Sequence, residues 1–404
     1  MILSLAWRNI WRNKRRSLII IAAIAVGLLC GLFASAVMFG MGDSLINTTI
    51  DRDLGHIQLH TKSFEDDKLL TDTIPAGQKI LSEIKTQPNV TGASARLIIE
   101  GMISSATSSG GIRITGIEPK DETNVTTIHN KVISGSYFES EEANQIVLGF
   151  KLAENLGIRE RSRVVLSFQG LDGSIIYGAF RVTGIFRTES TMFDRSTVFI
   201  RENDLLTLLN SEPIYHEIAI RANSVQNADS IYAGLQSSYG YISVQSWKEL
   251  APELKLMDEM MGLQLNIFLG VILFALLFGI TNTMLMSVLE RVREFGVLMA
   301  IGMKRRRVFL MIILETIVLS FVGGIVGMIM ASITIAYFSV AGIDLSAFAA
   351  GLSEFGLEAV LYPVLPIYFY ASITIMILLT AVFSAVYPAI KAIRLKPATA
   401  IRNY

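Results

Sequence analysis

The sequence predicts an α-helical membrane protein with four transmembrane helices plus a large α+β extracytoplasmic domain inserted between helices 1 and 2. The first observation is composition: 51% of the 404 residues are hydrophobic and only 17% are charged, against about 25% charged in ordinary soluble proteins. The second is that the uncharged residues form four long stretches. The third is that basic and acidic residues occupy different parts of the chain.

The four stretches are residues 17–42, 260–289, 316–343 and 359–390, and none contains Asp, Glu, Lys or Arg. A helix that crosses a bilayer needs about 20 apolar residues, and buried helices of soluble proteins rarely stay uncharged for that length. The first stretch is too long for the apolar region of a signal peptide, about 7–15 residues, and no small-residue cleavage motif follows it. It therefore predicts an uncleaved anchor.

Basic residues give the orientation. Residues 1–17 hold five basic residues and no acid, residues 290–307 hold six basic and two acidic residues, and the tail after residue 390 holds four basic residues and no acid. Four spans put these three segments on one side, and positively charged loops favour the cytoplasm. We therefore expect a multi-pass membrane protein with cytoplasmic N- and C-termini and a large domain outside the cytoplasm.

The formal net charge of zero conceals this division. Residues 43–259 carry 29 acidic and 20 basic residues, a charge of −9, and the rest of the chain carries +9. The lack of overall basicity disfavours a nucleic-acid partner. The predicted domains are an interfacial helix with span 1 (1–42), a periplasmic α+β domain (43–259), and spans 2–4 with a cytoplasmic helix (260–404). The interfacial helix is predicted because Leu3, Trp7, Ile10 and Trp11 form an apolar stripe along one helix face.

The outer region alternates strand-like and helix-like segments. Strands are predicted at residues 56–60, 111–117, 163–168, 179–186, 196–200 and 217–221, and helices at 76–85, 149–156, 202–209 and 227–236. The Ser-rich segment 104–111 is predicted to be a turn. Strands mixed with short helices indicate an α+β domain.

Neither a metal site nor a catalytic site is predicted. His56 and His60 share one face of a strand, but His129 and His216 are distant in sequence, so hydrogen-bonded or surface histidines are favoured over a metal site. No G-x-S-x-G motif occurs, and no Gly-Lys dipeptide is present for a Walker A loop. The chain is thus expected not to be an enzyme and to bind no cofactor; if ATP drives its work, ATP and Mg are bound by another polypeptide.

The segment 290–302, which links spans 2 and 3, has a helical pattern followed by the basic residues 304–307. Gly302 is suited to end the helix in a left-handed conformation. The helix could be a passive interfacial element, but an exposed Phe295 flanked by Arg and Glu favours a docking surface for a soluble protein partner. The candidate contact residues are Arg291, Arg293, Glu294, Phe295, Gly296 and Gly302.

Glu315 stands eight residues after Arg307, inside the predicted third helix. An ionisable residue there is costly and usually has a partner. A proton relay is possible, but pairing with a polar or backbone group of a neighbouring helix is favoured. Gly323, Gly324 and Gly327 provide small-residue faces for close helix contact.

Several motifs resemble those of MacB/FtsX-type ABC transporter permeases, and within them the lipoprotein-releasing LolC/LolE branch. The residues Glu290 to Gly302 match E-R-x-R-E-[FI]-G-x-L-x-A-I-G, and the tail from Pro388 to Arg402 is similar to the ending of the family. Residues 146–157 resemble the segment I-x-L-G-x-x-L-A-x-x-L-G. Residues 182–200, with Phe193 and Asp194, are closer to the lipoprotein-releasing branch.

This resemblance implies that the helix 290–302 is a coupling helix that docks into a separate ABC ATPase subunit. It implies a complex of two ATPases and two permease chains, as a homo- or heterodimer, that transmits movement to the outer domain. A lipoprotein-releasing member would extract lipidated proteins from membrane lipids and pass them to a periplasmic carrier. The alternatives are an exporter of peptides or small molecules that works with a periplasmic adaptor, and an FtsX-like regulator of a cell-wall hydrolase.

Overall fold

The computed structural model describes residues 14–138 and 142–394, in two compact units. The helical unit comprises Met1–Gly42, Asp258–Asp344 and Val360–Tyr404, and the outer unit comprises Asp43–Met257 and Leu345–Ala359. The segment Leu345–Ala359 was expected with the membrane part. It lies instead against the outer unit, where Thr191 Oγ1 donates a 3.3 Å hydrogen bond to Ser353 Oγ and Gly356 adjoins Leu45 and Ser190.

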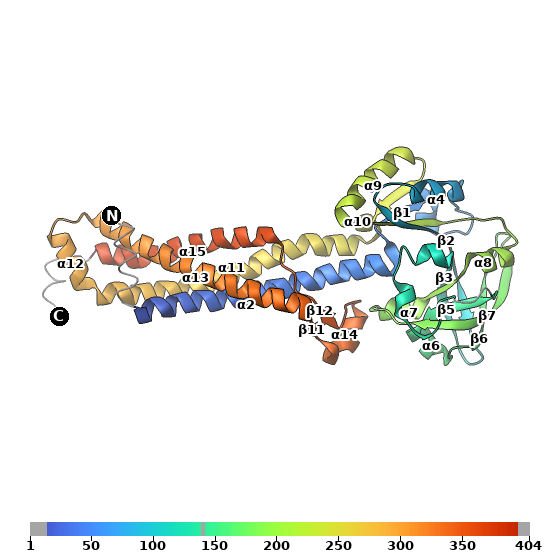
Figure 1. The fold of residues 1–404 in the computed structure, drawn as a ribbon, viewed down its shortest axis with the longest axis horizontal. Coiled ribbons are helices and arrows are strands. Elements are labelled where there is room, and N and C mark those ends of the chain that lie inside the picture. Colours follow the sequence, from blue (N-terminus) through green and yellow to red (C-terminus); the bar gives the residue numbers. More distant parts are fainter. Residues whose placement is uncertain (1–13, 139–141, 395–404) are drawn as a thin grey trace. The chain divides into compact units, whose positions relative to one another are not determined.

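Among the described residues, four helices are long and apolar enough to cross a membrane, and Figure 1 shows them as a bundle. They are α2 (Lys14–Thr49), α11 (Pro252–Glu290), α13 (Arg305–Ala341) and α15 (Ile367–Ile393), with the short helix α12 (Val292–Ala300) between α11 and α13 and a two-residue pairing of β11 (Ile343–Asp344) with β12 (Val360–Leu361). Each uncharged stretch is thereby confirmed to contain a long helix, although the last stretch, residues 359–390, begins with β12 and is helical only from Ile367. The predicted N-terminal Trp helix and most of the tail motif lie outside the described residues.

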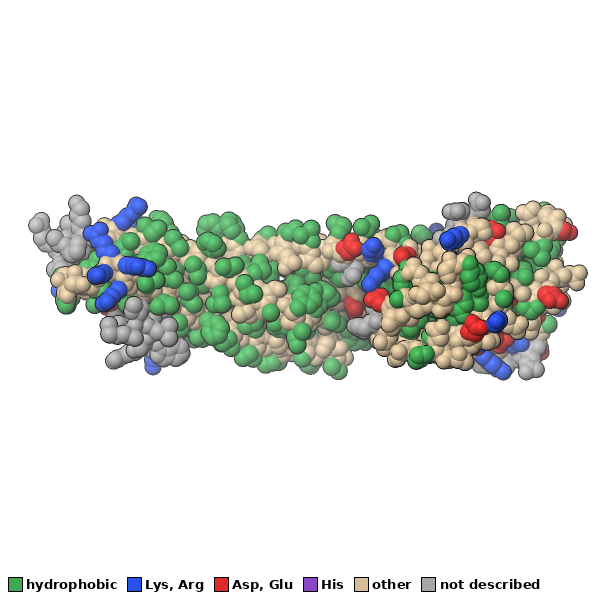
Figure 2. Space-filling view, turned by 90° about the horizontal axis from the view of Figure 1, so that it is seen from above, with side chains coloured by type: hydrophobic (Ala, Val, Ile, Leu, Met, Phe, Trp, Pro, Cys, Tyr) green, Lys and Arg blue, Asp and Glu red, His purple; other side chains and the backbone are tan. Residues whose placement is uncertain are grey.

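Figure 2 shows hydrophobic side chains over the surface of the bundle and a group of Lys and Arg side chains at its α12 end. Inside, α13 packs closely on α2 through glycines. A Cβ on Gly327 would lie 2.9 Å from Ala25 Cα, and one on Gly323 would lie 3.0 Å from Ile24 Cβ. These contacts confirm the expectation of close helix packing, because a larger side chain at either position would force the two helices apart.

The outer unit is built on a ten-stranded sheet with the order β10-β1-β9-β2-β3-β8-β5-β7-β4, and β6 pairs with both β2 and β7. Most pairs are antiparallel; β3 with β8 and β5 with β7 are parallel. The strands are β1 (Ile57–His60), β2 (Val90–Ser104), β3 (Ser109–Ile117), β4 (Val132–Gly135), β5 (Gln145–Gly149), β6 (Arg163–Gln169), β7 (Ile175–Phe186), β8 (Thr197–Arg201), β9 (Glu217–Ala222) and β10 (Ser243–Ser246).

Short helices and turns connect these strands. They are η1 (Ile50–Leu54), α3 (Lys62–Asp67), α4 (Gly77–Lys85), α5 (Pro119–Glu122), η2 (Ile128–Lys131), α6 (Phe150–Leu156), α7 (Thr191–Ser196), α8 (Glu202–Leu209), α9 (Val225–Ser238) and α10 (Trp247–Leu250), with η3 (Ser346–Phe348) and α14 (Ala349–Glu354) in the segment between spans 3 and 4. The α+β character is therefore confirmed. The longest strand, β2, was not predicted, because its run Leu97–Ile98–Ile99 is buried on both faces and lacks alternation.

Glycine is required at two positions of the 146–157 motif, for a different structural reason at each. Gly149 ends β5, and a Cβ there would lie 2.1 Å from the backbone oxygen of Asp194, so only glycine allows this approach to α7. Gly157 has a φ of +63° and ends α6 in the left-handed conformation. The motif therefore marks a strand-to-helix unit that packs against the backbone of α7.

Candidate functional site

The helix α12 lies between two chain reversals at one end of the bundle (Figure 1). Arg291, with φ −104° and ψ 16°, separates it from α11, and Gly302 follows it with a φ of +100°. The backbone N–H of Met303 donates to the carbonyl of Leu298 at 3.0 Å, which closes the last turn. The expected helix is therefore present, ended by Gly302 as predicted, although its first residue is Val292.

The side chain of Phe295 does not lie where the sequence suggested. It is 1% exposed and belongs to the hydrophobic core of the bundle, so the expectation of an exposed aromatic anchor is wrong. The physical reason is that the helix is seated on the bundle by the face that carries Arg291 and Phe295, four residues apart. Gly296 is buried beside it.

Arg291 is buried as well, with 8% of its surface exposed, and it joins three groups. Its Nη1 lies 3.1 Å from both carboxylate oxygens of Glu315 in α13, and its Nε donates to Glu294 at 3.0 Å. The guanidinium also lies over the ring of Phe295, 5.1 Å from the ring centre. Glu315 therefore has a charged partner in Arg291, the residue that precedes α12.

The opposite face of α12 is open. Arg293 and Glu294 are exposed, as are Val297 (41%) and Ile301 (80%). Val297 and Ile301 were not among the candidate residues, although they follow Arg293 at intervals of four, the spacing that places residues on one helix face. Lys304 and Arg305–Arg307 extend this surface with positive charge. The surface of Arg293, Glu294, Val297 and Ile301 is called the α12 outer face below.

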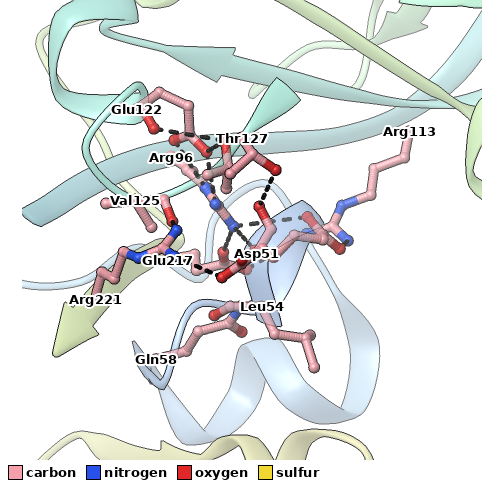
Figure 3. Close-up of polar contacts among 12 residues, drawn as sticks. Asp51, Leu54, Gln58, Arg96, Arg113, Glu122, Val125, Thr127, Glu217 and Arg221 are labelled. Atoms are coloured by element: carbon pink, nitrogen blue, oxygen red, sulfur yellow. Dashed lines mark hydrogen bonds and ion pairs between the residues drawn. The ribbon is translucent and has the colours of Figure 1, made fainter. Parts of the chain in front are cut away.

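A second charged site lies in the outer unit, where α2 ends in the π-helical turn η1 (Figure 3). The buried Arg96 of β2 holds Glu122 with two hydrogen bonds, of 2.7 and 3.1 Å, and Glu217 with a third. Arg96 Nη1 also donates to the carbonyl oxygen of Asp53 at 2.7 Å. Although burial lowers the pKa of Arg96, the carboxylates of Glu122 and Glu217 raise it above its ordinary value, so Arg96 is a permanent cation.

The other charged residues of η1 have partners of their own. Asp51 accepts from Arg221 of β9 at 2.7 Å, and its carbonyl accepts from the backbone N–H of Thr127 at 2.8 Å. Arg52 lies over the ring of Phe193 in α7, 5.1 Å from the ring centre. The turn is therefore fastened to β2, β9 and α7, and these contacts join the end of α2 to the sheet.

Three of the histidines, His56, His60 and His216, take part in hydrogen bonds in or beside the sheet. His216 Nδ1 accepts from the backbone N–H of Ile98 at 3.0 Å, and His60 Nε2 lies 2.9 Å from Gln58 Oε1. Burial lowers the pKa of both His56 and His216, which keeps the rings neutral. Within residues 14–138 and 142–394, no group of three His, Cys, Asp or Glu side chains could hold a metal ion.

The described residues contain four helices that could cross a membrane, and comparison with family models gives the class of the protein. Residues 17–238 match the MacB-like periplasmic core domain, and residues 266–397 match the FtsX-like permease C-terminal domain. The first match alone covers more than half of the chain. The chain therefore belongs to the MacB/FtsX-type family of ABC transporter permeases.

Individual relatives are distant. The uncharacterized ABC transporter permease YvrN of Bacillus subtilis (strain 168) is 23% identical, over 98% of both chains. The pyoverdine export ATP-binding/permease protein PvdT of Pseudomonas fluorescens is 24% identical over 98% of this chain but only 58% of its own length. The periplasmic region of MacB from Actinobacillus actinomycetemcomitans has 12% identity and a TM-score of 0.37, over 52% of this chain and 96% of that one.

Proposed function

We propose that this chain is the permease subunit of a mechanotransmitting ABC transporter that releases lipoproteins from the bacterial inner membrane. A separate ATPase subunit hydrolyses ATP, two permease chains pair, and movement of the periplasmic domain passes the cargo to a soluble carrier. The α12 outer face carries the ATPase part of this proposal, because it presents apolar and charged side chains together at the basic end of the bundle. The lipoprotein cargo is proposed from the resemblance of residues 182–200 to the lipoprotein-releasing branch.

The α12 outer face has the composition of a protein interface. Ile301 and Val297 supply apolar anchors, and Arg293 and Glu294 supply charges of both signs around them. A helix that only rests on anionic lipid would be uniformly basic. The basic residues Lys304 and Arg305–Arg307 next to this face support a cytoplasmic position, where an ATPase is available.

The bundle interior favours transmitted movement over a hydrophilic channel. Its core contains residues such as Leu28, Leu32, Leu265, Leu269 and Ile373, each fully buried. At the far end of α2, the turn η1 is fastened to the sheet by Asp51, Arg52 and Asp53, so the outer domain has an attachment through which a moving helix can act.

The helix α11 has the surface needed for a second permease chain or for lipid. Only 22% of the most apolar 18-residue segment of α11 is buried inside the protein, against 50% of the corresponding segment of α13. Large apolar side chains, among them Leu263, Ile267, Val271 and Phe274, are each about 60% exposed along it. Bilayer lipid and a second copy are both suitable neighbours for such a face.

A carrier could dock on the outer face of the β6–β7 hairpin. Ile175 and Tyr177 of β7 are 65% and 68% exposed, and Met102 of β2 is 49% exposed. The strand pairing puts Met102, Ser167 and Tyr177 in one row across β2, β6 and β7. Exposed apolar rows of this kind mark interaction surfaces.

The experiment uses the permease with its ATPase in proteoliposomes that contain a lipidated protein. We expect ATP-dependent transfer of the lipidated protein to a soluble carrier and no transfer of the same protein without lipid. The double variant Ile175→Ser/Tyr177→Ser should reduce transfer about tenfold, a loss that corresponds to about 1.4 kcal/mol of docking energy. Tyr241→Ser is the matched control, because Tyr241 is 62% exposed outside this face.

The second candidate is an exporter, which the name of the relative PvdT favours, since it refers to pyoverdine export. In the same vesicles an exporter would move a labelled peptide or small molecule across the membrane and leave the lipidated protein in place. That outcome would reject lipoprotein release. Activation of a cell-wall hydrolase without any transport would instead indicate the FtsX-like regulator.

A further inference from the structure

We propose that the buried ion pair between Arg291 and Glu315 is the link that makes α13 follow α12, so that both are positioning residues rather than ATPase contacts. This inference rests on the proposed function, in which α12 receives movement from an ATPase. It adds the contact through which movement of α12 is transmitted to α13. The inference is supported by the geometry of the ion pair, by the free-energy cost of burying its two charges, and by the packing of α13 on α2.

The two side chains face the bundle and are withdrawn from a docking partner. Side-chain exposure is 9% for Arg291 and 8% for Glu315. A single nitrogen of Arg291 lies 3.1 Å from both oxygens of Glu315, and the Nε remains bonded to Glu294. Since the guanidinium is planar and rigid, these contacts fix the position of α12 along α13 and its rotation about its own axis.

Stability alone does not explain such a pair. Removing two charges from water costs several kcal/mol per ion, and well-packed apolar residues of similar volume are often as stable or more stable. Phe295 already seats α12 on the bundle with an apolar ring that is 1% exposed. When a directional polar contact is added to apolar packing, it fixes the position of one helix against the other. This is the best-attested role of buried polar pairs.

Through Glu315, the ion pair is connected to a helix that packs inside the bundle. Glu315 stands in the first third of α13, and the same helix packs on α2 through Gly323 and Gly327. At Gly327 the approach is close enough that a Cβ would lie 3.0 Å from the carbonyl oxygen of Ala25. Because the contact is tight, a displacement of α13 is passed to α2, the helix that continues into η1.

The test compares isosteric variants in the permease–ATPase complex in proteoliposomes. Glu315→Gln keeps the volume but removes the charge, and we expect the lipidated protein released per ATP hydrolysed to fall about tenfold while the ATPase stays bound. Glu354→Gln is the matched control at an exposed position outside α12 and α13, and it should stay within about twofold of the wild type. The exchanged pair Arg291→Glu/Glu315→Arg should recover most of the loss, the coupling that a double-mutant cycle measures.

A second readout needs no cargo. In a Cys30→Ser background, spin labels at Ala300 of α12, which is not one of the α12 outer face residues, and at Ile329 of α13, both exposed, report the distance between the helices before and after ATP hydrolysis is trapped. We expect one unchanged distance in the wild type, because the helices move together, and a shifted or broadened distance in Glu315→Gln.

Wild-type values of both release per ATP and helix distance in Glu315→Gln would overturn the inference, as would an exchanged pair no better than the single variants. If the wild-type complex released no lipidated protein, the proposed cargo would be wrong, but the distance measurement would still decide whether the link exists.

Discussion

Replacement of Arg96 by methionine is expected to cost the outer domain about 3–5 kcal/mol, because removal of one partner from a buried ion cluster leaves the other charges uncompensated. Glu122 and Glu217 are at most 2% exposed at their side chains, and each depends on Arg96 for a short contact. Asp53 would also lose the hydrogen bond to its backbone oxygen, which releases η1 from β2.

Trp247 provides the signal for this measurement. It is buried in the outer unit, and the other two tryptophans, Trp7 and Trp11, can be replaced by Phe. Urea unfolding of the full chain in detergent then reports the outer unit. The control is Arg113→Met, because Arg113 is 34% exposed and its contacts to Asp53 and Glu217 are both 3.4 Å; such partly exposed pairs contribute about 0–1 kcal/mol. Equal midpoints for the two variants would contradict the assigned importance of the Arg96 cluster.

Gly149→Ala is the second substitution with a large expected effect. The added Cβ would lie 2.1 Å from the backbone oxygen and 2.5 Å from the Cα of Asp194, and backbone cannot move aside as a flexible side chain can. Overpacking of this kind costs about 1–3 kcal/mol and sometimes more, and we expect a loss at the upper end of this range. The same Trp247 unfolding curve measures it.

Gly110→Ala is the control for Gly149→Ala. Gly110 lies in β3, and an added Cβ would have no atom within 4 Å, so the change should stay within about 0.5 kcal/mol of the wild type. If Gly149→Ala were as mild as this control, the close approach of β5 to α7 would not be the reason for the glycine in the motif.

The long helices could be predicted because their signal is chemical and local. Absence of charge over more than 20 residues has few explanations other than a membrane. The orientation inferred from the basic clusters stays a prediction. The C-terminal end of α12 could be predicted too, since Gly302 ends the helix by a conformation that glycine adopts without strain.

The contacting face of α12 could not be predicted in the same way. Apolar residues occur on both sides of this helix: Phe295 is buried, whereas Val297 and Ile301 are exposed. Only the partner of Arg291 shows which face of α12 is buried. That partner, Glu315, is 24 residues away in α13. The cluster of Arg96 was missed for the same reason, because Glu217 is 121 residues away from it.

The central claim, that a separate ATPase drives this permease through α12, is tested most directly by co-purification. The permease is expressed with its ATPase, and the ATPase recovered per permease chain is measured for the wild type, for Ile301→Asp and for Met192→Asp, a control residue that is 76% exposed in the outer unit. We expect at least about tenfold less ATPase with Ile301→Asp, as for an interface anchor, and wild-type recovery with Met192→Asp. Full recovery of the ATPase with Ile301→Asp would contradict this claim.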